Sequence, residues 1–154
     1  MLRHLLTILI VFNFFQIYSQ DINWLTLDKA IELQKKNPKN IIMDMYTNWC
    51  GPCKLLDKKT FKNKDVSAYI NKHYYAVKFN AEGDSKVNYD GKLFANPNFQ
   101  PEKTQRRNGT HELTRYLNVS AYPTIIFMDN SSKLINYVRG YKTPQQLELW
   151  LKLF

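Results

Sequence analysis

The pattern of apolar and polar positions predicts a chain in which short strands alternate with short helices. Residues 41–46 form an almost continuous apolar run, which is typical of a central strand buried on both faces. Residues 74–80 alternate between apolar and polar positions, as in a strand that packs differently on its two faces. The apolar runs 125–128 and 134–139 flank the turn sequence 129–132, which predicts a hairpin.

Helical periodicity occupies most of the intervals between these runs. Apolar positions spaced three and four apart predict helices over residues 27–34, after the second cysteine, over 66–71, over 110–117 and over 144–154. Asp65 is expected to cap the third helix and Thr143 the last. The order helix, strand, helix, helix, strand, loop, helix, strand, strand, helix predicts the α/β class. We expect a central mixed sheet of four to five strands flanked by helices on both faces.

Residues 82–109 follow neither period. This stretch contains three of the five glycines, two prolines and four asparagines, so we expect a long surface excursion with one short helix or hairpin.

The first 20 residues, MLRHLLTILIVFNFFQIYSQ, have the three-part pattern of a secretory signal peptide. Arg3 gives a basic start, residues 5–15 are mostly apolar, and the end is more polar with the small residue Ser19. The apolar run is shorter than the about 20 residues that a membrane-spanning helix needs. We therefore predict a signal peptide over 1–20 and one domain over 21–154, with an uncleaved membrane anchor as the alternative.

The formal charge of +9 raises the question of an acidic partner. Lysines are interleaved with acids along the chain and no nucleic-acid-binding motif is present, so we expect no nucleic-acid partner. Lys103, Arg106, Arg107 and Arg115 could form a docking patch, although such a stripe is more often a solvated face.

Both cysteines of the chain, Cys50 and Cys53, lie between a predicted strand and a predicted helix. A Cys-x-x-Cys in this context indicates thiol–disulfide chemistry. A disulfide across so short a loop restrains the unfolded chain little, so chemistry explains the pair better than stability does. The rival is a metal site, but zinc needs four ligands, and His73 and His111 are isolated residues expected at the surface. We therefore expect no metal.

The segment Trp49-Cys50-Gly51-Pro52-Cys53-Lys54 resembles the signature of the thioredoxin family. Four further matches follow in order: Asp44, Lys78, the segment Tyr122-Pro123-Thr124, and Gly140. The resemblance covers about residues 40–154 without the excursion. The chain departs from cytosolic thioredoxins at Tyr46, where a second tryptophan is usual, at Lys58, where a helix-kinking proline is usual, and in the extra residues 82–109.

The predicted helix start gives the two sulfurs different roles. Cys50 lies where unpaired N–H groups and the helix dipole favour an anion, so its pKa should fall from about 8.5 toward about 7. We expect Cys50 to be the more exposed sulfur and the nucleophile, and Cys53, one turn later, to resolve the mixed disulfide. The resemblance implies that Asp44 is a buried acid that takes the proton of Cys53 through a water, and that Lys78 tunes it by charge. The alternatives are that Asp44 marks the end or an edge of its strand, and that Lys78 is a surface lysine.

The resemblance also implies a substrate site. Gly51 and Pro52 set the redox potential, Trp49 and Tyr122 form an apolar rim, and Gly140 lies beside the groove. Pro123, in cis, would let residue 122 pair with an extended substrate strand.

These residues predict a thiol–disulfide oxidoreductase, a reductase of protein disulfides. The only cofactor expected is the redox-active disulfide Cys50–Cys53. The signal peptide and the resemblance together imply a monomer in the periplasm that receives electrons from a membrane thiol–disulfide reductant. Two alternatives remain: a disulfide oxidase or isomerase, because an oxidising compartment favours these, and a binding module whose cysteines do no chemistry.

Overall fold

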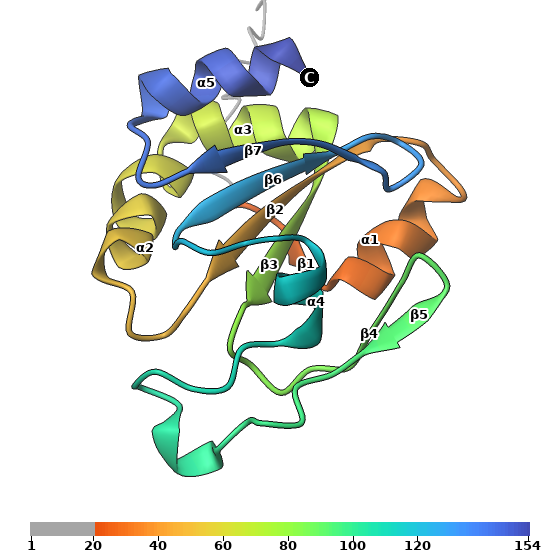
Figure 1. Ribbon diagram of the computed structural model, residues 1–154. Helices are drawn as coiled ribbons and strands as arrows, with labels where there is room; N and C mark the ends of the chain where they lie inside the picture. The colour runs from red at the N-terminus through yellow and green to blue at the C-terminus, as the bar shows by residue number, and fades with distance from the viewer. Residues whose placement is uncertain (1–20) are drawn as a thin grey trace, which may run out of the picture.

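The computed structural model describes residues 21–154, so the expected signal peptide lies outside the described residues (Figure 1). A five-stranded sheet runs through the middle in the order β1-β3-β2-β6-β7. Its strands are β1 (Trp24–Leu25), β2 (Asn40–Tyr46), β3 (Tyr74–Asn80), β6 (Thr124–Met128) and β7 (Leu134–Arg139). The first three are mutually parallel, whereas β6 and β7 run antiparallel to their neighbours. The mixed sheet that the sequence predicts is confirmed, and β1 is an addition to it.

Helices cover both faces of this sheet (Figure 1). One face packs against α2 (Gly51–Leu56), α3 (Lys64–His73) and α5 (Pro144–Leu153), and the other against α1 (Leu27–Gln34) and α4 (Glu112–Tyr116). The alternation of β3 decides which side chains enter each layer. Val77 and Phe79 join the core under α1, and Tyr74 and Ala76 join the core under α3 and α5.

The helix caps follow the sequence with one correction. Thr26 caps α1, and Thr143 forms a capping box with Gln146 at the start of α5. Helix α3 begins two residues earlier than expected, because the Asn63 side chain accepts hydrogen bonds from the backbone N–H groups of Asp65 and Val66. Asn63 therefore caps α3 in place of Asp65.

Residues 82–109 form the expected hairpin, β4 (Val87–Tyr89) and β5 (Lys92–Phe94), followed by a 3₁₀ turn over Pro101–Lys103. The segment is anchored to the core, since Val87, Tyr89 and Phe94 are buried beside α1 and α4. Asn96 closes its base by donating hydrogen bonds to the carbonyl oxygens of Gly83 and Gly109.

His111 is fully buried, so the expectation that it lies at the surface is wrong. Its Nδ1 accepts the Leu113 backbone N–H and caps α4, and its Nε2 donates to the Ser85 carbonyl oxygen at 2.7 Å. Burial lowers the pKa of His111, which keeps the imidazole neutral for this capping role.

Among residues 21–154, no helix has the length and apolar character required to cross a membrane.

Candidate active site

The two cysteines lie at the start of α2, the helix that follows β2 in the chain. Cys50 is the N-cap of α2 and forms a disulfide with Cys53, with their Cα atoms 5.3 Å apart. The backbone N–H of Cys53 donates to Cys50 Sγ at 3.1 Å. This N–H group belongs to the first helical turn and has no partner within the helix, so it is free to donate to a Cys50 thiolate and to stabilise the anion.

Both cysteines are closed off from solvent in the disulfide form. Cys50 is 3% exposed and Cys53 is 2% exposed, so both are buried in this oxidised state. The intervening Gly51 and Pro52 are exposed. Cys50 holds the cap position and is closed off by its disulfide partner, so the greater exposure of Cys50 stays a prediction for the reduced state.

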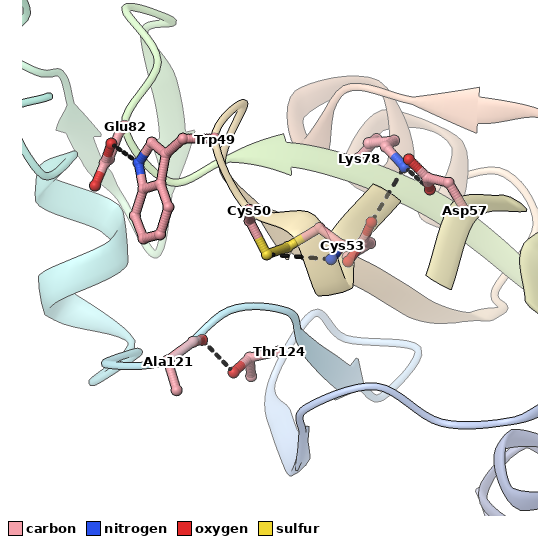
Figure 2. Close-up of a disulfide and its surroundings, with 9 residues drawn as sticks. Trp49, Cys50, Cys53, Asp57, Lys78, Glu82, Ala121 and Thr124 are labelled. Atoms are coloured by element: carbon pink, nitrogen blue, oxygen red, sulfur yellow. Dashed lines mark hydrogen bonds and ion pairs between the residues drawn. A yellow bond between two sulfur atoms is a disulfide. The ribbon is translucent and has the colours of Figure 1, made fainter. Parts of the chain in front are cut away.

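The apolar rim next to the cysteines is present. The rings of Trp49 and Tyr122 meet edge to face with centroids 6.2 Å apart. Burial, assisted by the Glu82 carboxylate, raises the pKa of Tyr122 to about 12, so its hydroxyl stays protonated. Figure 2 shows the 121–124 segment facing the disulfide.

The Tyr122–Pro123 peptide bond is cis, as the resemblance implies. Gly140 holds the neighbouring chain in place: its backbone N–H donates to the Pro123 carbonyl oxygen at 2.8 Å. Gly140 has a φ of +76°, a left-handed conformation that side chains with a Cβ rarely adopt, so the position favours glycine. The structure thus brings these two expected site residues together.

Asp44 is fully buried in the middle of β2, opposite Lys78 in the register of β3. Lys78 Nζ lies 3.2 Å from Asp44 Oδ2 as an ion pair, yet neither Asp44 oxygen receives a hydrogen bond from the described residues. Burial raises the pKa of Asp44 to about 6, and the Lys78 charge offsets only part of that effect. A carboxyl group with this pKa can accept and release a proton near neutral pH.

Lys78 joins this buried acid to a second carboxylate, Asp57, which the sequence did not single out. Lys78 Nζ forms an ion pair with Asp57 Oδ1 (Figure 2). The Lys78 side chain is 22% exposed and the Asp57 side chain is 41% exposed. The Lys78 ammonium group also lies 4.8 Å from the Trp24 ring centroid and 5.1 Å from that of Tyr46. Lys78 is therefore a bridging residue with one buried and one half-exposed partner, and not a surface lysine.

Asp57 owes its position to the turn that follows α2. Residues Asp57–Phe61 form a single π-helical turn, which contains Lys58 where the family usually has a proline. The wider turn keeps the chain helical, and the hydroxyl of its Thr60 donates to the Lys142 carbonyl oxygen near Gly140. The only sequence signal for Asp57 was an acid one helical turn after Cys53.

Glu82 is the other residue that sequence reasoning missed. Its Oε2 accepts the indole N–H of Trp49 at 2.7 Å (Figure 2). Glu82 opens the segment 82–109, whose composition indicated only a loop.

Among the described residues, no group of three or more His, Cys, Asp or Glu side chains is placed to hold a metal ion.

Comparison with known proteins agrees with this geometry. A family model described as a thioredoxin-like domain matches residues 27–154. Two curated relatives are thiol:disulfide interchange proteins DsbD, from Pectobacterium atrosepticum (26% identical over 121 residues, 77% of this chain) and from Actinobacillus pleuropneumoniae (28% over 126 residues, 78% of this chain). The chain spans only 17% and 18% of their lengths.

Solved structures show the same fold. The DsbH oxidoreductase superposes with a TM-score of 0.60 at 18% identity, covering 90% of each chain. A thioredoxin from Thermus thermophilus gives a TM-score of 0.63 at 12% identity, covering 87% of each chain. A putative disulphide-isomerase from Bacteroides thetaiotaomicron gives 0.56 at 26% identity, covering 82% of this chain and 86% of that one. A protein of this fold carries a redox-active disulfide as its reactive group, here Cys50–Cys53.

Proposed function

The chain belongs to the thioredoxin-like domain family, and from that premise we propose that it is a thiol–disulfide oxidoreductase that reduces protein disulfides outside the cytosol. The observation that carries the proposal is the joint placement of Cys50 at the N-cap of α2 and of a buried Asp44 whose pKa is about 6. The first feature activates a nucleophile, and the second supplies a base at the pH where the second cysteine must lose its proton.

The reaction starts from the reduced protein. The Cys50 thiolate attacks one sulfur of the substrate disulfide, so a Cys50–substrate disulfide forms and the other substrate sulfur leaves as a thiolate. Cys53 then gives its proton to Asp44 through a water and attacks Cys50 Sγ. The Cys50–Cys53 disulfide forms, and the second substrate sulfur leaves. Two electrons pass from the protein to the substrate, and Asp44 releases its proton afterwards.

Substrate would bind across the rim. Trp49 and Tyr122 offer apolar contact, and an extended chain would pair with the backbone at residue 122. Gly140 supports this segment through its bond to Pro123. These features support protein disulfides as the substrate class of the proposed enzyme, which we expect to act as a monomer.

The reducing direction of electron flow is part of this proposal, and two considerations support it. Gly51 and Pro52 are the intervening pair of reducing thioredoxins, and the DsbD relatives are thiol:disulfide interchange proteins. If the predicted signal peptide over 1–20 exports the domain to the periplasm, a membrane thiol–disulfide reductant would restore the reduced state. The second candidate function is disulfide isomerisation, which the 26% identity to the putative Bacteroides disulphide-isomerase favours.

A trapping experiment tests the oxidoreductase chemistry. Cys53→Ser leaves the nucleophile without its resolving partner, so mixed disulfides should accumulate on Cys50 when the reduced variant meets oxidised envelope proteins. The matched control, Cys50→Ser, should trap far less, because Cys53 lies deeper in the helix. Absence of any adduct on Cys53→Ser would refute the proposal.

The reduction potential of the Cys50–Cys53 pair tests the direction. A reductase should have a value near the about −270 mV of thioredoxin, and a strong oxidase a value near about −120 mV. A value at the oxidising end would favour the alternative function.

A further inference from the structure

The segment 82–109 touches the loop that carries the cysteines at three points. The Trp49 indole N–H donates to Glu82 Oε2 at 2.7 Å, and the Asn48 side chain donates to the Thr104 carbonyl oxygen at 2.8 Å. The Arg107 guanidinium carbon lies 4.9 Å from the Trp49 ring centroid. Contacts from the beginning and from the end of the segment therefore converge on the residue that precedes Cys50.

Glu82 holds the segment against the redox loop through two hydrogen bonds. It is 9% exposed, and its Oε2 accepts the backbone N–H of Asn108 at 2.9 Å in addition to the Trp49 indole. One oxygen atom thus ties together the start of the segment, its end and the redox loop. A carboxylate so deeply buried requires donors of this kind, so the bonds should persist in solution.

Arg107 contributes an exposed cation at the same place. Within residues 21–154, no carboxylate lies close enough to the Arg107 guanidinium group to form a salt bridge, so the cation–π contact with Trp49 is its main constraint. Lys103 and Arg106 are also exposed nearby in the sequence, and Glu102 is the only acid between residues 97 and 109. Residues 97–109 therefore carry a net positive charge, from Lys103, Arg106 and Arg107 against Glu102.

We propose that segment 82–109 forms one wall of the substrate site, in which Glu82 positions Trp49 and Arg107 binds an acidic side chain of the polypeptide whose disulfide is exchanged. The proposal rests on the proposed function and adds a substrate class to it. Charge complementarity selects the occupant: a guanidinium group over the ring of Trp49, the residue before the nucleophile, offers its donors to a carboxylate. Arg115, the fourth residue of the basic stripe, is excluded from this wall, because it donates to the Thr110 carbonyl oxygen at the start of α4.

Matched substrates test the selection. Three peptides of one sequence, each with an internal disulfide, would carry Glu, Gln or Lys next to the reacting cysteine, and kcat/KM would be measured for each with the full chain. We expect the reduced protein to favour the Glu peptide over the Gln peptide by about two- to fivefold, the range of exposed ion pairs. The Lys peptide should rank last. The preference should shrink in about 1 M salt, where the Debye length is about 3 Å.

Substitutions then identify the residue responsible. Arg107→Gln should bring the Glu:Gln ratio close to one, whereas Arg106→Gln removes the same charge from the neighbouring exposed position and should keep the ratio. Equal loss in both variants would indicate a diffuse field and overturn the role of Arg107. A ratio of one in the wild-type protein, with the Gln peptide still reduced, would overturn the inference alone. Failure to reduce any peptide would overturn the proposed function and this inference with it.

Glu82 acts through Trp49, so its variants need a readout that general destabilisation does not move. Glu82→Leu should lower the Glu:Gln ratio, because Trp49 loses its acceptor and Arg107 loses its platform. Glu82→Gln keeps an acceptor oxygen at the same reach and should restore the ratio, and circular dichroism would show whether both variants are folded. If Glu82→Leu is folded and keeps the wild-type ratio, Glu82 is not a positioning residue.

Discussion

Replacing Asp44 with asparagine removes a buried charge from the centre of the sheet and keeps the size of the side chain. Burial raises the pKa of Asp44 from 3.8 to about 6, against the opposing effect of Lys78. The difference is about two pKa units, each worth about 1.4 kcal/mol, so the ionised carboxylate lowers the free energy of unfolding by about 3 kcal/mol. Asp44→Asn should recover most of that amount at neutral pH.

The sign of the pH dependence follows from which state binds the proton more tightly. The folded protein keeps a proton on Asp44 up to about pH 6, whereas the unfolded chain loses it near pH 3.8. Between these values the free energy of unfolding of the wild type should fall as the pH rises, and above about pH 6 the full penalty should apply. Asp44→Asn lacks this slope, so the two proteins should be close in stability near pH 4 and furthest apart above pH 7.

Urea unfolding of the oxidised proteins at a series of pH values measures this difference directly. Asp84→Asn, which removes an exposed acid, is the matched control and should leave the free energy of unfolding unchanged. A stability difference between wild type and Asp44→Asn that does not vary between about pH 4 and about pH 8 would refute the reasoning. So would an Asn variant that is less stable than the wild type at neutral pH.

The same substitution should harm turnover while it helps folding. Without a base for the Cys53 proton, the mixed disulfide should persist longer and the rate of resolution should lose its rise around pH 6. Rapid-quench trapping of the mixed disulfide would measure this step. Unchanged rates between about pH 6 and about pH 8 would remove Asp44 from the mechanism and leave only its effect on stability.

Three further substitutions address other parts of the structure. Asp57→Asn removes a negative charge that raises the pKa of Asp44, so the pH–rate profile of turnover should move to lower pH; an unmoved midpoint would contradict the coupling. Gly109→Ala places a Cβ 2.4 Å from the Asn98 carbonyl oxygen, so segment 82–109 should be destabilised by about 1–3 kcal/mol. Limited proteolysis should then cut the segment faster than in the wild type. If the variant resists proteolysis as well as the wild type does, the backbone accommodates the methyl group. Thr143→Ala removes the cap of α5 and should lower the free energy of unfolding, measured by urea titration, by about 1 kcal/mol. An unchanged free energy would mean that the capping box does not stabilise the fold.

Sequence reasoning recovered the strands well where a strong apolar pattern governs them. β3 begins and ends where predicted, and β2 differs by one residue, because their side chains must fill two separate cores. β1 escaped notice because it is two residues long and has no periodicity. The cap of α3 was misplaced by two residues, since Asn63 and Asp65 are both good capping residues and only the backbone geometry distinguishes them.

The site was predictable to the extent that its residues match a linear motif. The order of Asp44, Cys50, Cys53, Lys78 and Pro123 along the chain indicated the site. In the structure Asp44 pairs with Lys78, and Cys50 pairs with Cys53. The contacts of Asp57, Glu82 and Arg107 were not predictable, because each depends on how a turn or a long segment folds back on the redox loop. A single acid or arginine in a loop has no periodicity to mark it.

Burial of the disulfide changes where specificity can arise. The Cys50 sulfur is almost inaccessible in the oxidised state, so an incoming donor thiolate must displace or fit between the residues around it before exchange begins. The free energy for that step has to come from contacts at the rim, which include Trp49 and the wall that Glu82 and Arg107 build against it. Changes in the wall should therefore alter kcat/KM for individual partners and leave the reduction potential of the pair unchanged. The potential depends instead on how α2 stabilises the Cys50 thiolate.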